Sequence, residues 1–115
     1  MTEGDVVLTP LPHADGETKA CPAILLRQVP PLRDWLVCGV STQLHHEVVG
    51  FDDVIEQSRA DFADSGLKAP SLILLGYLAV LPAMALLEVI GSISPKRHGR
   101  LLPRLGAFLQ SPGSA

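Results

Sequence analysis

Short runs of β-branched and aliphatic residues, each bounded by proline, glycine or polar residues, recur along most of the chain. Such runs are typical of β-strands, because branched side chains suit an extended backbone. Strands are therefore expected at residues 5–8, 23–26, 35–40, 71–75, 77–81 and 89–93, with a further short strand at 46–51. Many short strands with little helix favour a mostly β fold that closes into a small barrel, since closure removes exposed strand edges.

Prolines and turn residues mark the expected ends of these strands. Pro10 and Pro12 are expected to close the first strand, because proline cannot donate to a strand ladder. The polar segment 13–20 that follows is expected to be a loop. Residues 71–75 and 77–81 are interpreted as two buried strands joined at a turn.

Two internal segments are expected to form short helical turns. Residues 56–65 suit one or two turns, with Gly66 as the stop, because glycine readily adopts the left-handed conformation that ends helices. Residues 82–87 begin with a proline, which is tolerated at the first position of a helix.

A longer helix is expected near the C-terminus. Ser94 followed by Pro95 is typical of a helix N-terminus. Apolar residues at helical spacing come next, at Leu101, Leu102, Leu105, Phe108 and Leu109. Pro103 lies among them and is expected to kink the helix or to split it in two.

The length of 115 residues is enough for one domain over residues 1–115 and leaves no room for a second independent core. Because 47% of the residues are hydrophobic and only 4% aromatic, the core must consist of aliphatic side chains. The formal net charge of -3 argues against coating by nucleic acid over the whole surface, but not against a local basic groove. Two cysteines, Cys21 and Cys38, are too few for a disulfide framework.

A cytoplasmic location is expected, because the acidic N-terminal residues lack the basic-then-apolar order of a secretory signal. Residues 69–87 carry no charge and precede several basic residues, which raises the alternative of a membrane span. Pro70, Gly76 and Pro82 within that stretch favour buried strands instead. No membrane partner is therefore expected.

Five short motifs in a fixed order resemble the MazF/PemK-like ribonuclease toxins. None is specific alone, but their order and spacing match the family over about residues 4–109. The motifs are Gly-Asp-Val-Val at 4–7, Lys-Ala-Cys-Pro-Ala-Ile-Leu-Leu at 19–26, Ser-Thr-Gln at 41–43, Gly-Leu-Lys-Ala-Pro-Ser at 66–71 and Ile-Gly-Ser-Ile at 90–93.

This resemblance implies an SH3-like barrel that forms a homodimer. Known members of the family cleave single-stranded RNA, including mRNA, without a metal ion or other cofactor. A cognate antitoxin, an acidic protein with a disordered tail that can fold onto the toxin, blocks them. The implied function is that of the toxin in a type II toxin–antitoxin system.

Metal-free cleavage of RNA uses the adjacent 2′-hydroxyl as nucleophile, so a protein must move protons and stabilise charge on the phosphorane. Arginine suits the second task, and the family places an arginine where this chain has Cys21. A neutral thiol supplies no fixed positive charge. Either Lys19 or Arg27 compensates, or the protein is a binding module that holds an antitoxin or RNA without cleaving it.

Further candidate site residues follow from the same resemblance. Ser41 corresponds to the family's catalytic hydroxyl, although a hydroxyl at a strand end can also simply satisfy the backbone. Thr42 and Gln43, and with them Arg27, are candidate RNA-binding residues. His13 lies in the polar loop where some members place an acid–base histidine, since imidazole can take and give protons near neutral pH.

The remaining histidines and aromatic residues have ordinary structural explanations. His45 and His46 would point to opposite faces of a strand, and their spacing does not predict a metal site. Trp35 and Tyr77 are too isolated to form a base-stacking platform and are expected to pack in the core.

A basic run on the terminal helix is either a solvated face or a contact surface for RNA or an acidic antitoxin. It comprises Lys96, Arg97, Arg100 and Arg104. Asp52 and Asp53 are expected to form a solvated turn.

Overall fold

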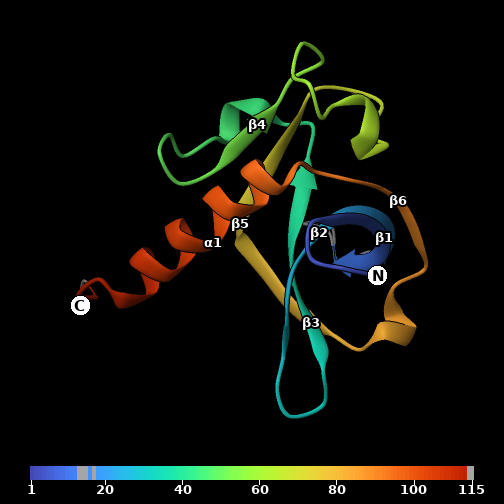
Figure 1. The fold of residues 1–115 in the computed structure, drawn as a ribbon, viewed down its shortest axis with the longest axis vertical. Helices are drawn as coiled ribbons and strands as arrows, with labels where there is room; N and C mark the ends of the chain where they lie inside the picture. Colours follow the sequence, from blue (N-terminus) through green and yellow to red (C-terminus); the bar gives the residue numbers. More distant parts are fainter. Residues whose placement is uncertain (13–15, 17, 114–115) are drawn as a thin grey trace.

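Six antiparallel strands form one curled sheet in the order β4-β5-β3-β2-β1-β6, and a single α-helix follows them (Figure 1). The computed structural model describes residues 1–12, 16 and 18–113. The mostly β class with a C-terminal helix is confirmed. The strands are β1 (Asp5–Pro12), β2 (Thr18–Val29), β3 (Asp34–Ser41), β4 (Asp53–Ile55), β5 (Ser71–Leu81) and β6 (Glu88–Ser92), with 3₁₀ turns η1 (Leu44–His46), η2 (Ala63–Ser65) and η3 (Ala83–Ala85) and the helix α1 (Pro95–Gln110).

Both faces of the sheet are packed, because successive residues along a strand point to opposite sides. Val6 joins one apolar cluster and Val7 the other, and Ile24 and Leu25 divide in the same way. The first cluster also holds apolar side chains of α1, and the second holds Trp35, whose expected place in the core is confirmed. Burial of both faces explains why the strands are apolar runs instead of alternating patterns.

The expectation that Pro10 helps to end the first strand is wrong, because β1 continues through it to Pro12, which is its last residue. The carbonyl of Leu8 accepts a hydrogen bond from the amide of Leu87 on the β6 side, and backbone groups two residues apart face the same way. Both proline nitrogens therefore face the β6 side of β1 beyond the last β1–β6 pair, Leu8–Glu88. No ladder hydrogen bond is lost there. Residues 18–20, expected in the loop, belong to β2.

Residues 71–81 form one strand and not two joined at a turn. The β3–β5 register is irregular: Gly39 lies opposite Leu74, whereas Cys38 lies opposite Leu78. Gly76 falls in the unpaired segment, as glycines in β-bulges often do. The uncharged stretch 69–87 is thus mainly β5, and no helix among the described residues is long and apolar enough to cross a bilayer.

The strand expected at 46–51 is absent, and the pairing strand is β4, Asp53–Ile55. Asp52, expected in a solvated turn, is buried. Its carboxylate accepts the amides of Val48 at 2.9 Å and Leu75 at 3.0 Å, which fixes the loop between η1 and β4 to the sheet. Two backbone donors without strand partners account for the buried acid.

The segment 56–65 contains only the 3₁₀ turn η2, and its expected stop at Gly66 is confirmed by a left-handed φ of 74°. The segment containing η2 packs so closely on β6 that there is no room for a side chain at the contact positions of either segment. A Cβ on Gly66 would overlap the carbonyl of Ile90, and one on Gly91 would overlap the carbonyl of Asp64. This contact joins the far end of the curled sheet to the segment that leads into β5.

The terminal helix is assigned without a break through Pro103, so the expectation of two separate pieces is wrong. Ser94 caps it as expected, since its hydroxyl oxygen accepts the amide of Arg97 at 3.1 Å. Leu101 and Leu105 pack one face of the helix against the sheet. This packing offsets the single backbone hydrogen bond that is lost at the exposed Pro103.

A buried ion network fastens the start of α1 to the rest of the chain. Arg97 donates from Nε and Nη2 to the two oxygens of Asp61, at 2.9 and 3.1 Å. Its Nη1 donates to Asp53 at 2.8 Å and to the carbonyl of Val54 at 3.2 Å. The Arg97 guanidinium lowers the pKa of Asp61 to about 2, although burial acts in the opposite direction.

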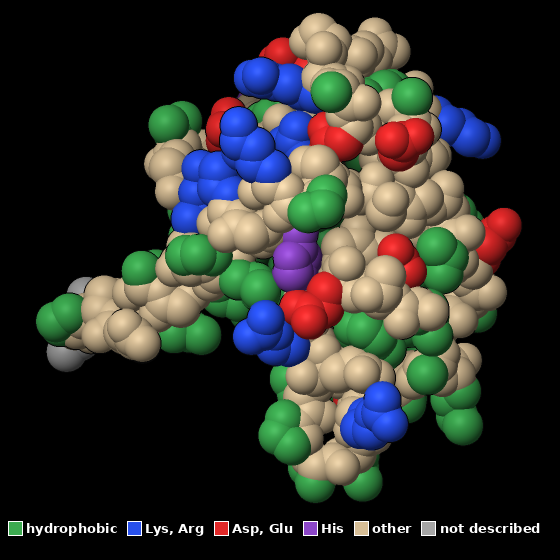
Figure 2. Space-filling view, viewed as in Figure 1, with side chains coloured by type: hydrophobic (Ala, Val, Ile, Leu, Met, Phe, Trp, Pro, Cys, Tyr) green, Lys and Arg blue, Asp and Glu red, His purple; other side chains and the backbone are tan. Residues whose placement is uncertain are grey.

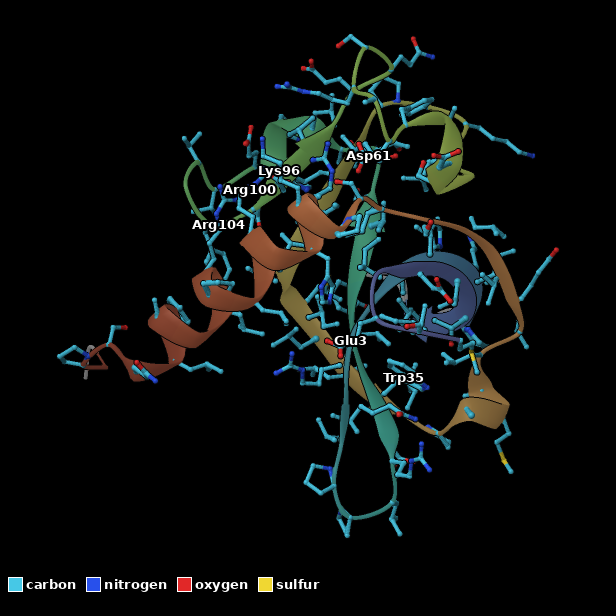
Figure 3. The ribbon with its side chains drawn as sticks, in the orientation of Figure 1. Glu3, Trp35, Asp61, Lys96, Arg100 and Arg104 are labelled. Atoms are coloured by element: carbon cyan, nitrogen blue, oxygen red, sulfur yellow. The ribbon has the colours of Figure 1, made fainter. Side chains whose placement is uncertain are left out.

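Two more residues of the basic run join this network. Arg100 donates to Asp53 at 2.8 Å, and Arg104 donates to the Asp52 carbonyl at 3.0 Å and reaches Asp53 at 3.4 Å. Both arginines project from α1 toward the β4 segment in Figure 3, and basic side chains gather there beside acidic ones in Figure 2. The expectation of a solvated basic face is therefore wrong for the buried Arg97, whereas Arg100 and Arg104 remain partly exposed beside Asp53. Asp53 itself is not a solvated turn residue.

The close approach of η2 and β6 predicts that Gly91→Ala lowers the free energy of unfolding by about 3 kcal/mol, because the new methyl group must displace backbone. Gly99→Ala is the matched control: a Cβ there meets nothing within 4 Å, so a helical alanine should stabilise by about 0.5–1 kcal/mol. Urea unfolding measures both. Equal stability of the two variants would contradict this packing.

The Arg97–Asp61 pair predicts that the free energy of unfolding decreases at acidic pH. Because the pKa of Asp61 is about 2 instead of the usual 3.8, its ionised form contributes about 2 kcal/mol, complete above about pH 4 and lost as the pH falls toward 2. Asp61→Asn should remove this component, whereas Asp64→Asn, at an exposed side chain, should keep it. Unfolding measured from pH 2 to 7 tests it; identical pH slopes for wild type and Asp61→Asn would refute the pairing.

Candidate active site

A cleft of about 560 Å³ opens between the outer ends of β2 and β3. It is lined from four sides: by the β1–β2 hairpin, by the end of β3, by η1 and by β5. Among the residues that the structure describes, the lining consists of Leu11, Ala20, Cys21, Pro22, Gly39, Val40, Ser41, Thr42, Gln43, His46, Ser71, Leu74 and Tyr77.

The cleft exists because β2 and β3 separate. Their ladder ends at the pair Ala23–Gly39, and extending its register by two residues would place Cys21 opposite Ser41. Instead, Cys21 stays paired with β1 and Ser41 with β5. The two strands diverge around the space between these side chains, and this divergence explains why residues 20 positions apart line one cleft.

Pro22 gives a physical reason for the separation. The carbonyl of Leu25 accepts the amide of Gly4 on the β1 side, so the backbone of Ala23 and Cys21 faces that side too. Pro22 then faces β3, where the next ladder bond would need its amide hydrogen. Proline has none, and the ladder stops.

Ser41 both supports its turn and keeps a hydrogen to donate. Its Oγ accepts the amide of Gln43 at 3.0 Å, as the backbone-satisfying alternative expects. A hydroxyl has one donor hydrogen besides its lone pairs, so the O–H remains able to bind an acceptor in the cleft. Thr42 and Gln43 are exposed at the rim.

The two cysteines have different environments. Cys21 is half-buried and faces the cleft. Cys38 is fully buried in the first apolar cluster, and burial raises the pKa of its thiol to about 12. Only Cys21 is therefore placed to meet a ligand in the cleft.

The candidate cations lie outside the cleft lining. Lys19 is exposed on β2 opposite Leu11 and, being two positions from Cys21, is on the same face of the strand. Arg27 is six positions further along β2 than Cys21, and its Nε lies 3.2 Å from the carboxylate of Glu3, which is labelled in Figure 3. His13 lies outside the described residues.

Two residues that the sequence did not single out for the site line the cleft. His46 lies on η1 and not on a strand, with its ring centroid 4.2 Å from that of His45. Tyr77, expected in the core, is 38% exposed and lies against Gly39, where a Cβ would meet its ring at 3.4 Å. Neither position is readable from the sequence, because η1 and the β5 bulge create both.

The chemistry available in the cleft comes from uncharged donors and titratable groups. Among the described lining residues there is no lysine, arginine, aspartate or glutamate. The hydroxyls of Ser41, Thr42 and Ser71 can donate hydrogen bonds, and the imidazole of His46 can move a proton. Such a set suits an anionic ligand held by hydrogen bonds more than one held by fixed charge.

Comparison with known proteins adds a fold assignment. No family model matches the sequence, and no curated protein matches it. The structure is similar to that of the Mycobacterium tuberculosis toxin MazF-mt6, with a TM-score of 0.65 and 22% sequence identity over 95% of this chain and 99% of that one. The chain thus has the fold of the MazF/PemK-like toxins.

Proposed function

We propose that the protein is the toxin of a type II toxin–antitoxin pair, an endoribonuclease that cleaves single-stranded RNA without a metal ion. The observation that carries this proposal is the shared cleft of Cys21 and Ser41. A phosphodiester can rest between them, and the rim residues Thr42 and Gln43 are within the same lining for contacts with phosphate or base. The fold shared with MazF-mt6 is consistent with this activity.

Ser41 has the clearest task in such a reaction. As the neighbouring 2′-hydroxyl attacks phosphorus, negative charge builds on the phosphoryl oxygens. Ser41 already has its oxygen fixed by the amide of Gln43, so its O–H points from a rigid position at no ordering cost during the reaction. It therefore stabilises the phosphorane by a preorganised hydrogen bond.

A second candidate function is supported by the absence of fixed positive charge among the described lining residues. With Cys21 in place of the family's arginine, a binding module that holds an antitoxin or RNA without cleaving it has the same fold and cleft. The two functions differ in one measurable quantity, the rate of RNA cleavage. Lys19, on the same strand face as Cys21, is the candidate that would compensate.

The proposal includes a cytoplasmic location, a homodimer and an antitoxin with an acidic, disordered tail. Large apolar side chains are exposed from the second half of β5 to β6, which is consistent with a protein partner or a second copy. They include Val80, Met84, Leu87 and Val89.

Ser41→Ala is expected to lower the cleavage rate of a single-stranded RNA oligonucleotide by about 10²-fold, because one preorganised donor to the phosphorane is lost. Ser58→Ala removes an exposed hydroxyl outside the cleft and is the matched control, with an unchanged rate. Cleavage is followed by gel electrophoresis of end-labelled RNA. Full activity of Ser41→Ala would exclude this cleft as the catalytic site.

Cys21→Arg is expected to raise the cleavage rate by about 10²-fold, because a guanidinium would supply the missing charge beside the phosphorane. Cys21→Ala removes the thiol without adding charge and should cleave at the wild-type rate. A wild type without activity and a cleaving Cys21→Arg would favour the binding module. If the wild type cleaves RNA and Cys21→Arg cleaves it at the same rate, the positive charge is supplied by another residue.

A further inference from the structure

The side chains lining the cleft differ sharply in their capacity to move protons near neutral pH. Thiols and phenols ordinarily titrate well above neutrality, and aliphatic hydroxyls do not titrate at all in water. Imidazole is the residue type that titrates near pH 7. Among the described lining residues, His46 is the one that carries an imidazole.

His46 is held on the same short turn as the proposed phosphate-binding residues. Its amide donates to the carbonyl of Gln43 at 3.1 Å, and the Gln43 amide in turn donates to Ser41. The orientation of η1 relative to β3 is thereby fixed by two consecutive hydrogen bonds. The ring itself is exposed at the wall of the cleft, so a ligand can reach it.

The groups around His46 leave it available for proton transfer. On its own segment it neighbours His45, with which its ring is in contact, and Glu47. Asp52 lies beside the same wall, but both its oxygens already accept backbone amides. From the facing strands the titratable groups are Tyr77 on β5 and, across the cleft, Cys21 on β2.

The geometry points to His46 as the general base of the ribonuclease reaction, an inference that rests on the proposed function. Neutral imidazole takes the proton from the 2′-hydroxyl while that oxygen bonds to phosphorus and the bond from phosphorus to the 5′ oxygen breaks. The departing 5′ oxygen takes a proton from water, and the imidazolium later returns its proton to solvent. The products are a 2′,3′-cyclic phosphate and a 5′-hydroxyl.

This assignment also accounts for the missing arginine. The imidazole becomes positively charged at the moment when negative charge develops on the phosphorane. A cation thus arises beside Ser41 in the transition state, although no fixed positive charge is present among the described lining residues. Such a charge stabilises the transition state more than the bound substrate, which is the requirement for catalysis.

The chain contains its own matched control, because His45 is the same residue type on the same turn, is also exposed and is not among the residues that line the cleft. His46→Gln, His45→Gln, Ser41→Ala and wild type are compared on one single-stranded RNA oligonucleotide, with DNA of the same sequence as a substrate lacking the nucleophile. His46→Gln should lower kcat by about 10²–10⁴-fold with little change in KM, and His45→Gln should stay within about threefold of wild type. Thermal unfolding should be unchanged in both histidine variants.

The pH profile separates proton transfer from a structural role. Wild-type kcat should fall as the pH is lowered and the base becomes protonated, and His46→Gln should lose this dependence. A His46→Gln variant with the wild-type rate and acid limb would overturn the assignment, while loss of cleavage in Ser41→Ala would leave the proposed function standing. Equal losses in both histidine variants would also overturn it. A wild type that cleaves no RNA would overturn both the assignment and the nuclease proposal.

Discussion

The ion network around Arg97 is the interaction on which the rest of the fold depends. One buried guanidinium joins the start of α1, the turn carrying Asp61 and the strand β4 that begins at Asp53. Removing one member of a buried pair leaves an uncompensated charge, at a cost of about 3–5 kcal/mol. The network therefore holds α1 across one face of the sheet. It also holds the segment that contains η2 against β6, where Gly91 has no side chain to obstruct the contact. Residues that look like a nucleic-acid surface in the sequence serve this structural purpose, with three arginines facing two carboxylates.

The cleft follows from a different constraint, the missing amide hydrogen of Pro22. By ending the β2–β3 ladder, it separates two strands that are neighbours everywhere else and exposes Cys21 and Ser41 to a shared space. The β2–β3 register, extended past the last pair, places these two residues opposite each other, and both line that space. The same short turn that follows Ser41 then brings His46 to the wall. Fold and candidate chemistry are linked here through one backbone position.

The positions that were predictable from the sequence are those set by local pattern. Apolar runs located most strands, Ser94 located the start of α1, and Gly66 located the end of η2, because propensity and capping act over a few residues. The errors have tertiary causes. Strand β1 passes through Pro10 because a neighbour strand ends there, and Asp52 is buried because the backbone of another strand needs an acceptor. At the site, the order of the motifs identified Cys21 and Ser41 as candidates. The positions of His46 and Tyr77 depend on a turn and a bulge that no local pattern encodes.

RNA is proposed to lie in the cleft between Cys21 and Ser41 and not along the basic run of α1. The most direct measurement is an NMR titration of the labelled protein with a 2′-O-methyl RNA oligonucleotide, whose blocked nucleophile prevents cleavage. Amide signals of residues 39–46 are expected to shift, while those of residues 96–104 change little. Shifts concentrated on residues 96–104, without shifts in residues 39–46, would contradict the placement of RNA in the cleft.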